Sequence, residues 1–215
     1  MCGPLTRKAD SEGDIMDNGI TEKISEKKQI ILAREKTFAN DLGAAVLEKP
    51  KLSVWMILIP IILVYYMMRF QRYSDSRKDF SENYMISRNR ALDAAAEMAG
   101  TGKKPDPAEL SRLSDVPESA RGKHAEFTRV LIEHYGLLLE AEGDDYGALV
   151  RSAYGEGTNY LLFLNLLNKA ERRMNKALRP HLADSVEGFD EIVQRMEAQS
   201  ERLRREHAGL IFPSR

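Results

Sequence analysis

The sequence has few of the residues on which covalent or metal-dependent chemistry depends. Its 215 residues include one cysteine, Cys2. A single cysteine excludes a disulfide within the chain and a metal site built on several thiolates. The histidines are His124, His134, His181 and His207. No two of them are three or four residues apart, so none forms the local pair typical of a helical zinc site. We therefore expect no metal and no cofactor.

An excess of charge of one sign is also missing. The chain has 32 Lys and Arg against 33 Asp and Glu, which gives a formal net charge of -1. Without a strongly basic domain, a broad nucleic-acid surface is not expected. A small basic cluster occurs at Arg202, Arg204 and Arg205. Glu201 and Glu206 dilute it, and we interpret it as favourable charge near a helix end.

No complete catalytic or nucleotide-binding motif is present. Residues 100–104 read Gly-Thr-Gly-Lys-Lys, which matches only the end of a phosphate-binding loop. The complete motif requires glycine at position 97 and serine or threonine at position 104, where this chain has Glu97 and Lys104. The segment before it is also predicted to be helical rather than a strand. We therefore predict no catalytic residue.

Alternation of apolar and polar residues, which would indicate a strand, is not sustained anywhere, whereas helical spacing recurs in at least five segments. The sequence thus predicts an all-α protein with one short transmembrane or re-entrant helix, a helical stalk and a C-terminal helical bundle. The expected parts are a disordered tail at 1–19, an amphipathic helix at 20–48, the anchor at 52–68, the stalk at 69–99 and a helical domain at 105–215.

Residues 52–68 contain no charged side chain, and nine of them are Leu, Ile or Val. As a helix they are about 25 Å long, against a hydrocarbon core of about 30 Å, which is the short end of a spanning helix. Aromatic residues near both ends suit the membrane interfaces, and a central proline predicts a kink. The residues that define this membrane anchor are Leu52, Trp55, Pro60, Tyr65, Tyr66 and Met68.

The flanking charges favour a single pass with a cytoplasmic C-terminal region. Arg69, Arg72, Arg77 and Lys78 follow the run, against two lysines just before it. This orientation exports an N-terminal segment that carries nine basic residues. A re-entrant anchor, which enters and leaves on one side, is the alternative that keeps both flanks in the cytoplasm.

Apolar residues near the C-terminus follow the alternating three- and four-residue spacing of a coiled-coil seam. We interpret them as a candidate contact seam for a second copy or a partner helix. The alternative is that this helix packs on residues 123–178 of its own chain. The seam residues are Val186, Phe189, Val193, Met196 and Leu203.

Together these features predict a membrane-anchored helical protein that acts as a non-enzymatic interaction or assembly module. Its expected partners are the lipid bilayer and another protein, or a second copy, bound through helices. Two alternatives remain. One is a membrane-tethered enzyme with its site in the helices of residues 105–182, and the other is a tether that binds anionic lipid.

Overall fold

The computed structural model describes residues 9–47, 76–114, 116–181 and 189–213. All regular structure in these ranges is helical, which confirms the all-α prediction. The predicted anchor at residues 52–68 lies outside them. None of the helices that the structure does describe is long and apolar enough to cross a membrane. The helices are α1 (Ala9–Leu47), α3 (Ser76–Thr101), α4 (Pro107–Arg112), α5 (Glu118–Glu140), α6 (Tyr146–Tyr154), α7 (Gly157–Leu178), the 3-10 turn η1 (Arg179–His181) and α8 (Phe189–Ile211).

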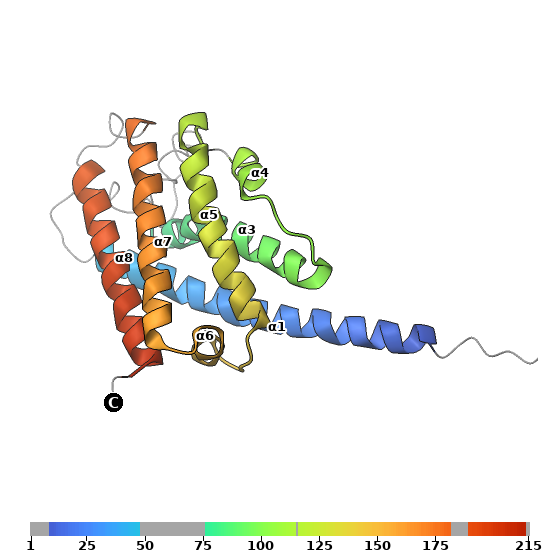
Figure 1. Ribbon diagram of the computed structural model, residues 1–215. Helices are drawn as coiled ribbons and strands as arrows, with labels where there is room; N and C mark the ends of the chain where they lie inside the picture. The colour runs from blue at the N-terminus through green and yellow to red at the C-terminus, as the bar shows by residue number, and fades with distance from the viewer. Residues whose placement is uncertain (1–8, 48–75, 115, 182–188, 214–215) are drawn as a thin grey trace, which may run out of the picture.

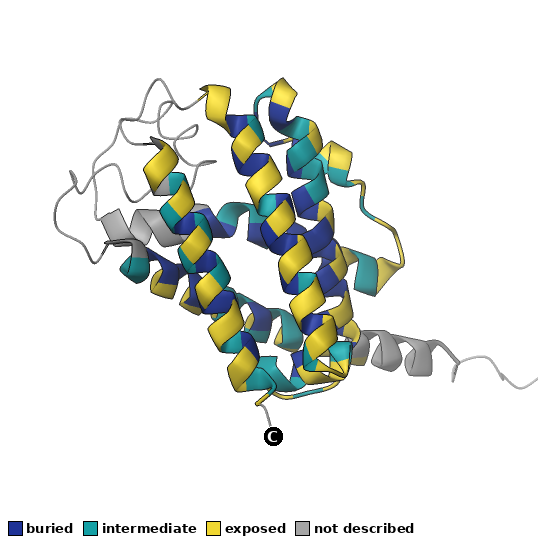
Figure 2. Cartoon of the chain, turned by 60° about the vertical axis from the view of Figure 1, so that its left-hand side comes forward, coloured by how far each residue is buried: buried dark blue, intermediate teal, exposed yellow. Residues whose placement is uncertain are grey.

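The long helices form two crossed layers. Helices α5, α7 and α8 stand side by side, and α1 and α3 cross behind them (Figure 1). Helix α6 lies across one end of α5 and α7. Buried residues recur along the helices, where they alternate with intermediate and exposed ones (Figure 2). The largest fully buried side chains include Phe127 and Tyr135 of α5, Leu92 of α3 and Ile31 of α1. These residues belong to helices of both layers, so a single core joins them.

Helix α3 is part of this core and does not project from it as a stalk. Its buried residues Ala91, Leu92 and Ala95 pack in the same cluster as Phe127 and Leu131 of α5. The Ala-rich face of α3 therefore packs against α5 and α1. Helix α1 begins at Ala9, well before the predicted start at residue 20. The helix expected at 20–48 and the domain expected at 105–215 thus share one interior.

Polar caps and one glycine set the ends of the short helices. The Asp106 carboxylate accepts a hydrogen bond from the Ala108 amide, and Asp145 accepts one from the amide of Ala148. Both satisfy amides that have no partner inside a helix. Before α6 the chain turns at Gly143, whose φ is 153°. A Cβ there would lie 2.6 Å from the Cβ of Ala148, so only glycine fits this turn.

Candidate functional site

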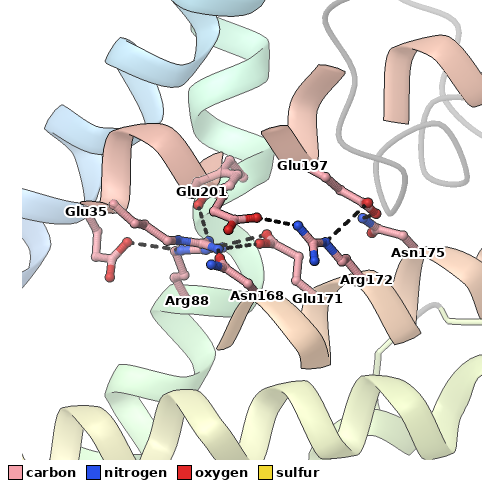
Figure 3. A network of polar contacts seen from close by, with 10 residues as sticks. Glu35, Arg88, Asn168, Glu171, Arg172, Asn175, Glu197 and Glu201 are labelled. Carbon is pink, nitrogen blue, oxygen red and sulfur yellow. Dashed lines mark hydrogen bonds and ion pairs between the residues drawn. The ribbon is translucent and has the colours of Figure 1, made fainter. Parts of the chain in front are cut away.

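Four charged side chains meet in the middle of the bundle. They are Glu35 of α1, Arg88 of α3, Glu171 of α7 and Arg204 of α8, hereafter the buried ionic cluster (Figure 3). The two arginine side chains are 5% and 6% exposed, and the two glutamates 14% and 16%. Charges this far from solvent are costly unless they are paired and hydrogen-bonded. Each of these four side chains is therefore paired with an opposite charge on another helix.

The cluster is a chain of alternating charges. Arg88 Nε donates to Glu35 Oε2 at 3.0 Å. On its other side Arg88 Nη2 lies 3.8 Å from Glu171 Oε1. Arg204 Nη1 donates to the second Glu171 oxygen, Oε2, at 2.7 Å. Two guanidinium groups balance two carboxylates, so the cluster has no net charge and no cation left to bind a substrate.

Neutral groups complete the hydrogen bonding. The Tyr135 hydroxyl of α5 donates to Glu35 Oε1 at 2.9 Å, and the Asn168 side-chain oxygen accepts from Arg204. The Tyr84 ring stacks under Arg88, whose Cζ lies 3.7 Å from the ring centroid, a favourable cation–π arrangement. Through Tyr135 the network reaches α5, so it joins five helices.

Electrostatics keep Glu171 and Arg88 ionised despite their burial. Burial opposes the charged form of Glu171, but Arg204 and Arg88 outweigh it and lower the pKa of this carboxyl below its usual value. Burial also opposes the charge on Arg88, yet Tyr84 and the two glutamates raise its pKa. Burial raises the pKa of Tyr84 to about 12, so this hydroxyl stays protonated.

A small cavity lies beside the cluster. Its volume is about 40 Å³, and its lining includes Arg88, Arg204, His134, Tyr146 and Tyr160. A single water needs about 10–15 Å³ of such volume, so the cavity has room for a few waters. It is too small for an organic substrate. The arrangement of charges is better suited to holding helices together than to catalysis.

His134 is the histidine of α5 that faces this cavity. Its Nδ1 lies 2.7 Å from the Tyr154 hydroxyl, and its Nε2 lies 3.4 Å from the Tyr146 hydroxyl. The ring stacks on Phe163 with centroids 4.1 Å apart. Burial lowers the pKa of His134 to about 3. The imidazole is therefore neutral near pH 7, with both nitrogens occupied by tyrosines.

The surface of the bundle has a second distinctive feature, on the side of α7 away from the core. Residues at alternating spacings of four and three share this side: Leu162, Leu166, Lys169, Arg173 and Lys176, hereafter the α7 outer face. The two leucines are 63% and 50% exposed. The three cations line an open surface depression of about 510 Å³ that also includes Arg172 and Glu201.

Leu137 of α5 extends the apolar half of this face. It is 45% exposed. Arg173 lies 3.7 Å from Glu126, and Phe163 stacks on His134, which fixes the antiparallel register of α7 and α5. The same register places Leu137 level with Leu162. The exposed leucines thus gather at one end of the α5–α7 pair and the cations at the other.

The structure places the predicted contact seam only in part. Val186 lies outside the described residues, and α8 begins at Phe189. Val193 packs partly buried against the core, and Met196 and Leu203 are buried within the chain. These three side chains contact α8's own neighbours, as in the alternative of internal packing. All six anchor residues, Leu52, Trp55, Pro60, Tyr65, Tyr66 and Met68, lie outside the described ranges.

The buried ionic cluster was not predicted, although the sequence carries a signal for it. Glu171 follows the buried Leu167 by four residues and precedes the buried Met174 by three. It therefore occupies a position of the apolar stripe of α7. Glu35 and Arg88 stand in equivalent positions of α1 and α3. Opposite charges within apolar stripes of different helices indicate buried pairing.

Comparisons with known proteins add no relative: no protein-family model, no curated protein and no solved structure matches this chain.

Proposed function

We propose that the chain is a membrane-held helical module that binds another protein through the α7 outer face and catalyses no reaction. The observation that carries this proposal is the face itself. Contiguous exposed leucines are characteristic of binding surfaces. Here they continue into cations, of which Lys169 and Lys176 form no ion pair with any residue that the structure describes.

The chemistry of the face specifies the partner. Leucines four residues apart on one side of a helix accept the apolar side of another helix, and the cations beyond them attract carboxylates. Arg173 is paired with Glu126, and Arg172 with Glu197 and Glu201, which leaves the two lysines available. The expected partner is an amphipathic helix with an acidic end. The interior cavity, which has room for only a few waters, further favours binding over catalysis.

The membrane part of the proposal is based on sequence. Residues 52–68 are uncharged and bracketed by Lys49, Lys51, Arg69 and Arg72. At roughly -0.5 kcal/mol for each of nine Leu, Ile or Val, insertion gains about 4 kcal/mol. The full chain is expected to pellet with membranes and to resist an alkaline wash.

Quantitative affinity purification of the full chain from detergent-solubilised native membranes tests the binding. Leu162→Ser/Leu166→Ser and Lys169→Ser/Lys176→Ser should each deplete the same co-purifying protein, the lysine variant more strongly as salt is lowered. Leu113→Ser is the matched control, because Leu113 is 73% exposed but lies on α4's C-cap, away from this face. A partner protein lost equally from the control, or retained by both double variants, contradicts the proposal. Loss of anionic lipid instead of protein supports the lipid tether.

A further inference from the structure

Helices α1 and α3 flank the uncharged run in the sequence, yet they pack against each other in space. Lys28 Nζ of α1 lies 2.8 Å from Asp93 Oδ1 of α3. The rings of Phe38 and Tyr84 are 6.0 Å apart. Together with the Glu35–Arg88 pair, these contacts fix an antiparallel register over several turns. The chain therefore leaves the bundle at Leu47 and rejoins the same bundle at Ser76.

A membrane that separated α1 from α3 would divide the core. Glu35 would lose both Arg88 and the Tyr135 hydroxyl, and the buried Ile31, Phe38 and Leu42 of α1 would lose the packing that buries them. Arg88 and Arg204 would then share one carboxylate, Glu171, in an apolar interior. A buried charge without its partner is strongly unfavourable. The fold thus requires both flanks on one side.

We propose that α1 and α3 lie on the same side of the bilayer, so that the whole bundle docks on a single membrane surface. This inference rests on the proposed membrane attachment and goes beyond it. It corresponds to the re-entrant alternative and differs from the single pass expected from the excess of basic residues after the run.

Length excludes two full crossings between these helices. Residues 48–75 are about 42 Å long as a helix, and crossing a hydrocarbon core of about 30 Å twice requires about 60 Å. An extended chain is longer, but lipid does not satisfy its backbone hydrogen bonds. The 28 residues between the two helices are therefore too few for two helical crossings.

The flanking charges agree with this arrangement. Lys49 and Lys51 before the run and Arg69 and Arg72 after it all meet the headgroups of one leaflet. A surface of anionic lipid attracts both pairs. Basic residues on both flanks then favour the cytoplasmic side together. No part of the N-terminal segment has to be exported.

A crosslink between α1 and α3 within native membranes tests the inference. In full-length chain carrying Cys2→Ser, the pair Lys28→Cys/Asp93→Cys removes one ion pair completely and leaves no unpaired charge. A second pair, Ser25→Cys/Glu97→Cys, uses exposed residues level with each other in the same register and keeps that ion pair. Membranes are treated with a short bismaleimide and washed at alkaline pH, and crosslinked peptides are identified by mass spectrometry. Lys28→Cys alone is the control.

We expect an intramolecular crosslink in the alkali-resistant pellet, to the same extent as in detergent. A resistant pellet whose crosslink forms only after detergent is added overturns the one-sided arrangement and leaves the membrane attachment standing. Release of the chain by the wash overturns the attachment and the inference with it. A crosslink absent from both pairs in detergent as well contradicts the packing of α1 on α3 and overturns the inference.

Discussion

At the scale of single residues, Glu171 is the carboxylate on which both buried arginines depend. Arg204 donates to one of its oxygens and Arg88 approaches the other. The cluster links helices that are far apart in sequence. A buried ion pair contributes little net stability, but removal of one partner is strongly destabilising because it leaves a buried charge unpaired.

Glu171→Gln should lower the free energy of unfolding by about 3–5 kcal/mol. The substitution removes the carboxylate that pairs with Arg204 and leaves Arg88 with Glu35 alone. The measurement is urea or thermal unfolding of the detergent-solubilised chain. Glu133→Gln is the control, since Glu133 and its partner Arg129 are both 59% exposed. That surface pair should contribute no more than about 0.5 kcal/mol. Equal effects of the two substitutions would contradict the role given to the cluster.

His134 makes the fold sensitive to acid. Its pKa is about 3 in the fold, against the ordinary 6.5, because burial disfavours the charged ring. Between these values the unfolded chain binds a proton that the folded chain does not. Stability should therefore fall as the pH drops from 6.5 towards 3, by about 1.4 kcal/mol per pH unit. His124, with a pKa lowered to about 4 by burial and Arg90, adds to the slope.

His134→Gln should flatten this dependence, because glutamine hydrogen-bonds to both tyrosines and does not titrate. Unfolding midpoints at pH 7, 6 and 5 measure it. The same series for His181→Gln, which alters an exposed histidine, should keep the wild-type slope. An unchanged slope for His134→Gln would show that other groups cause the acid sensitivity.

Residue patterns predicted which positions are buried better than they predicted which side chains contact each other in the core. Arg204 illustrates this. The sequence assigns it, with Arg202 and Arg205, to favourable charge near a helix end, whereas its side chain is 6% exposed and lies in the core. Its position four residues after the buried Ser200 is the available signal. Its partners Glu171 and Asn168 depend on how α7 and α8 are placed, and local spacing does not contain that information.

At the scale of helices, α8 shows a stripe whose inner part lies in the chain's own core. Met196 and Leu203 are each 8% exposed, whereas Leu210 is 79% exposed. Periodicity established that this segment is helical and which side is apolar. It did not distinguish an internal neighbour from another chain, since both present the same apolar surface. The same holds for α3, whose neighbours α1 and α5 are separated from it by long stretches of sequence.

Val193→Asp should destabilise the chain by about 1–3 kcal/mol without changing its mass in detergent, because Val193 packs on the core. Gln194→Asp, on the exposed side one residue later, is the control and should be near neutral. Thermal unfolding and sedimentation of the solubilised chain measure the two effects. A shift in sedimentation with unchanged thermal stability would favour the contact seam between chains.

At the scale of the whole molecule, the hydrophobic run is an insertion into a helical bundle. The composition of residues 52–68 predicted an anchor but divided the chain into a part before it and a part after it. The packing of α1 on α3 joins those two parts. The hydrophobicity of a segment indicates whether it prefers lipid or water. It contains no information about how the helices before and after the segment pack against each other.

Replacement of residues 48–75 by a Gly/Ser linker of similar length should give a water-soluble chain with the same helices. The reason is that described residues of α1, α3, α5, α7 and α8 already form one continuous core with each other. Circular dichroism and thermal unfolding, compared with the detergent-solubilised full chain, measure it. Deletion of residues 1–75 is the contrasting variant and should unfold or aggregate, since it removes α1. Loss of helix from the linker variant would contradict this account.

The position of Arg204 in the chain also orders events during biosynthesis. The ribosome makes α1 and the hydrophobic run long before it makes α8. At about 5–20 residues per second, on the order of 10 s passes between the emergence of Met68 and that of Arg204. Throughout that interval Glu171 has at most one of its two arginines, and Phe38 lacks the guanidinium of Arg204 that comes to lie 5.4 Å from its ring. The run therefore emerges from the ribosome while the bundle is still open, and α8, which is made last, closes the fold.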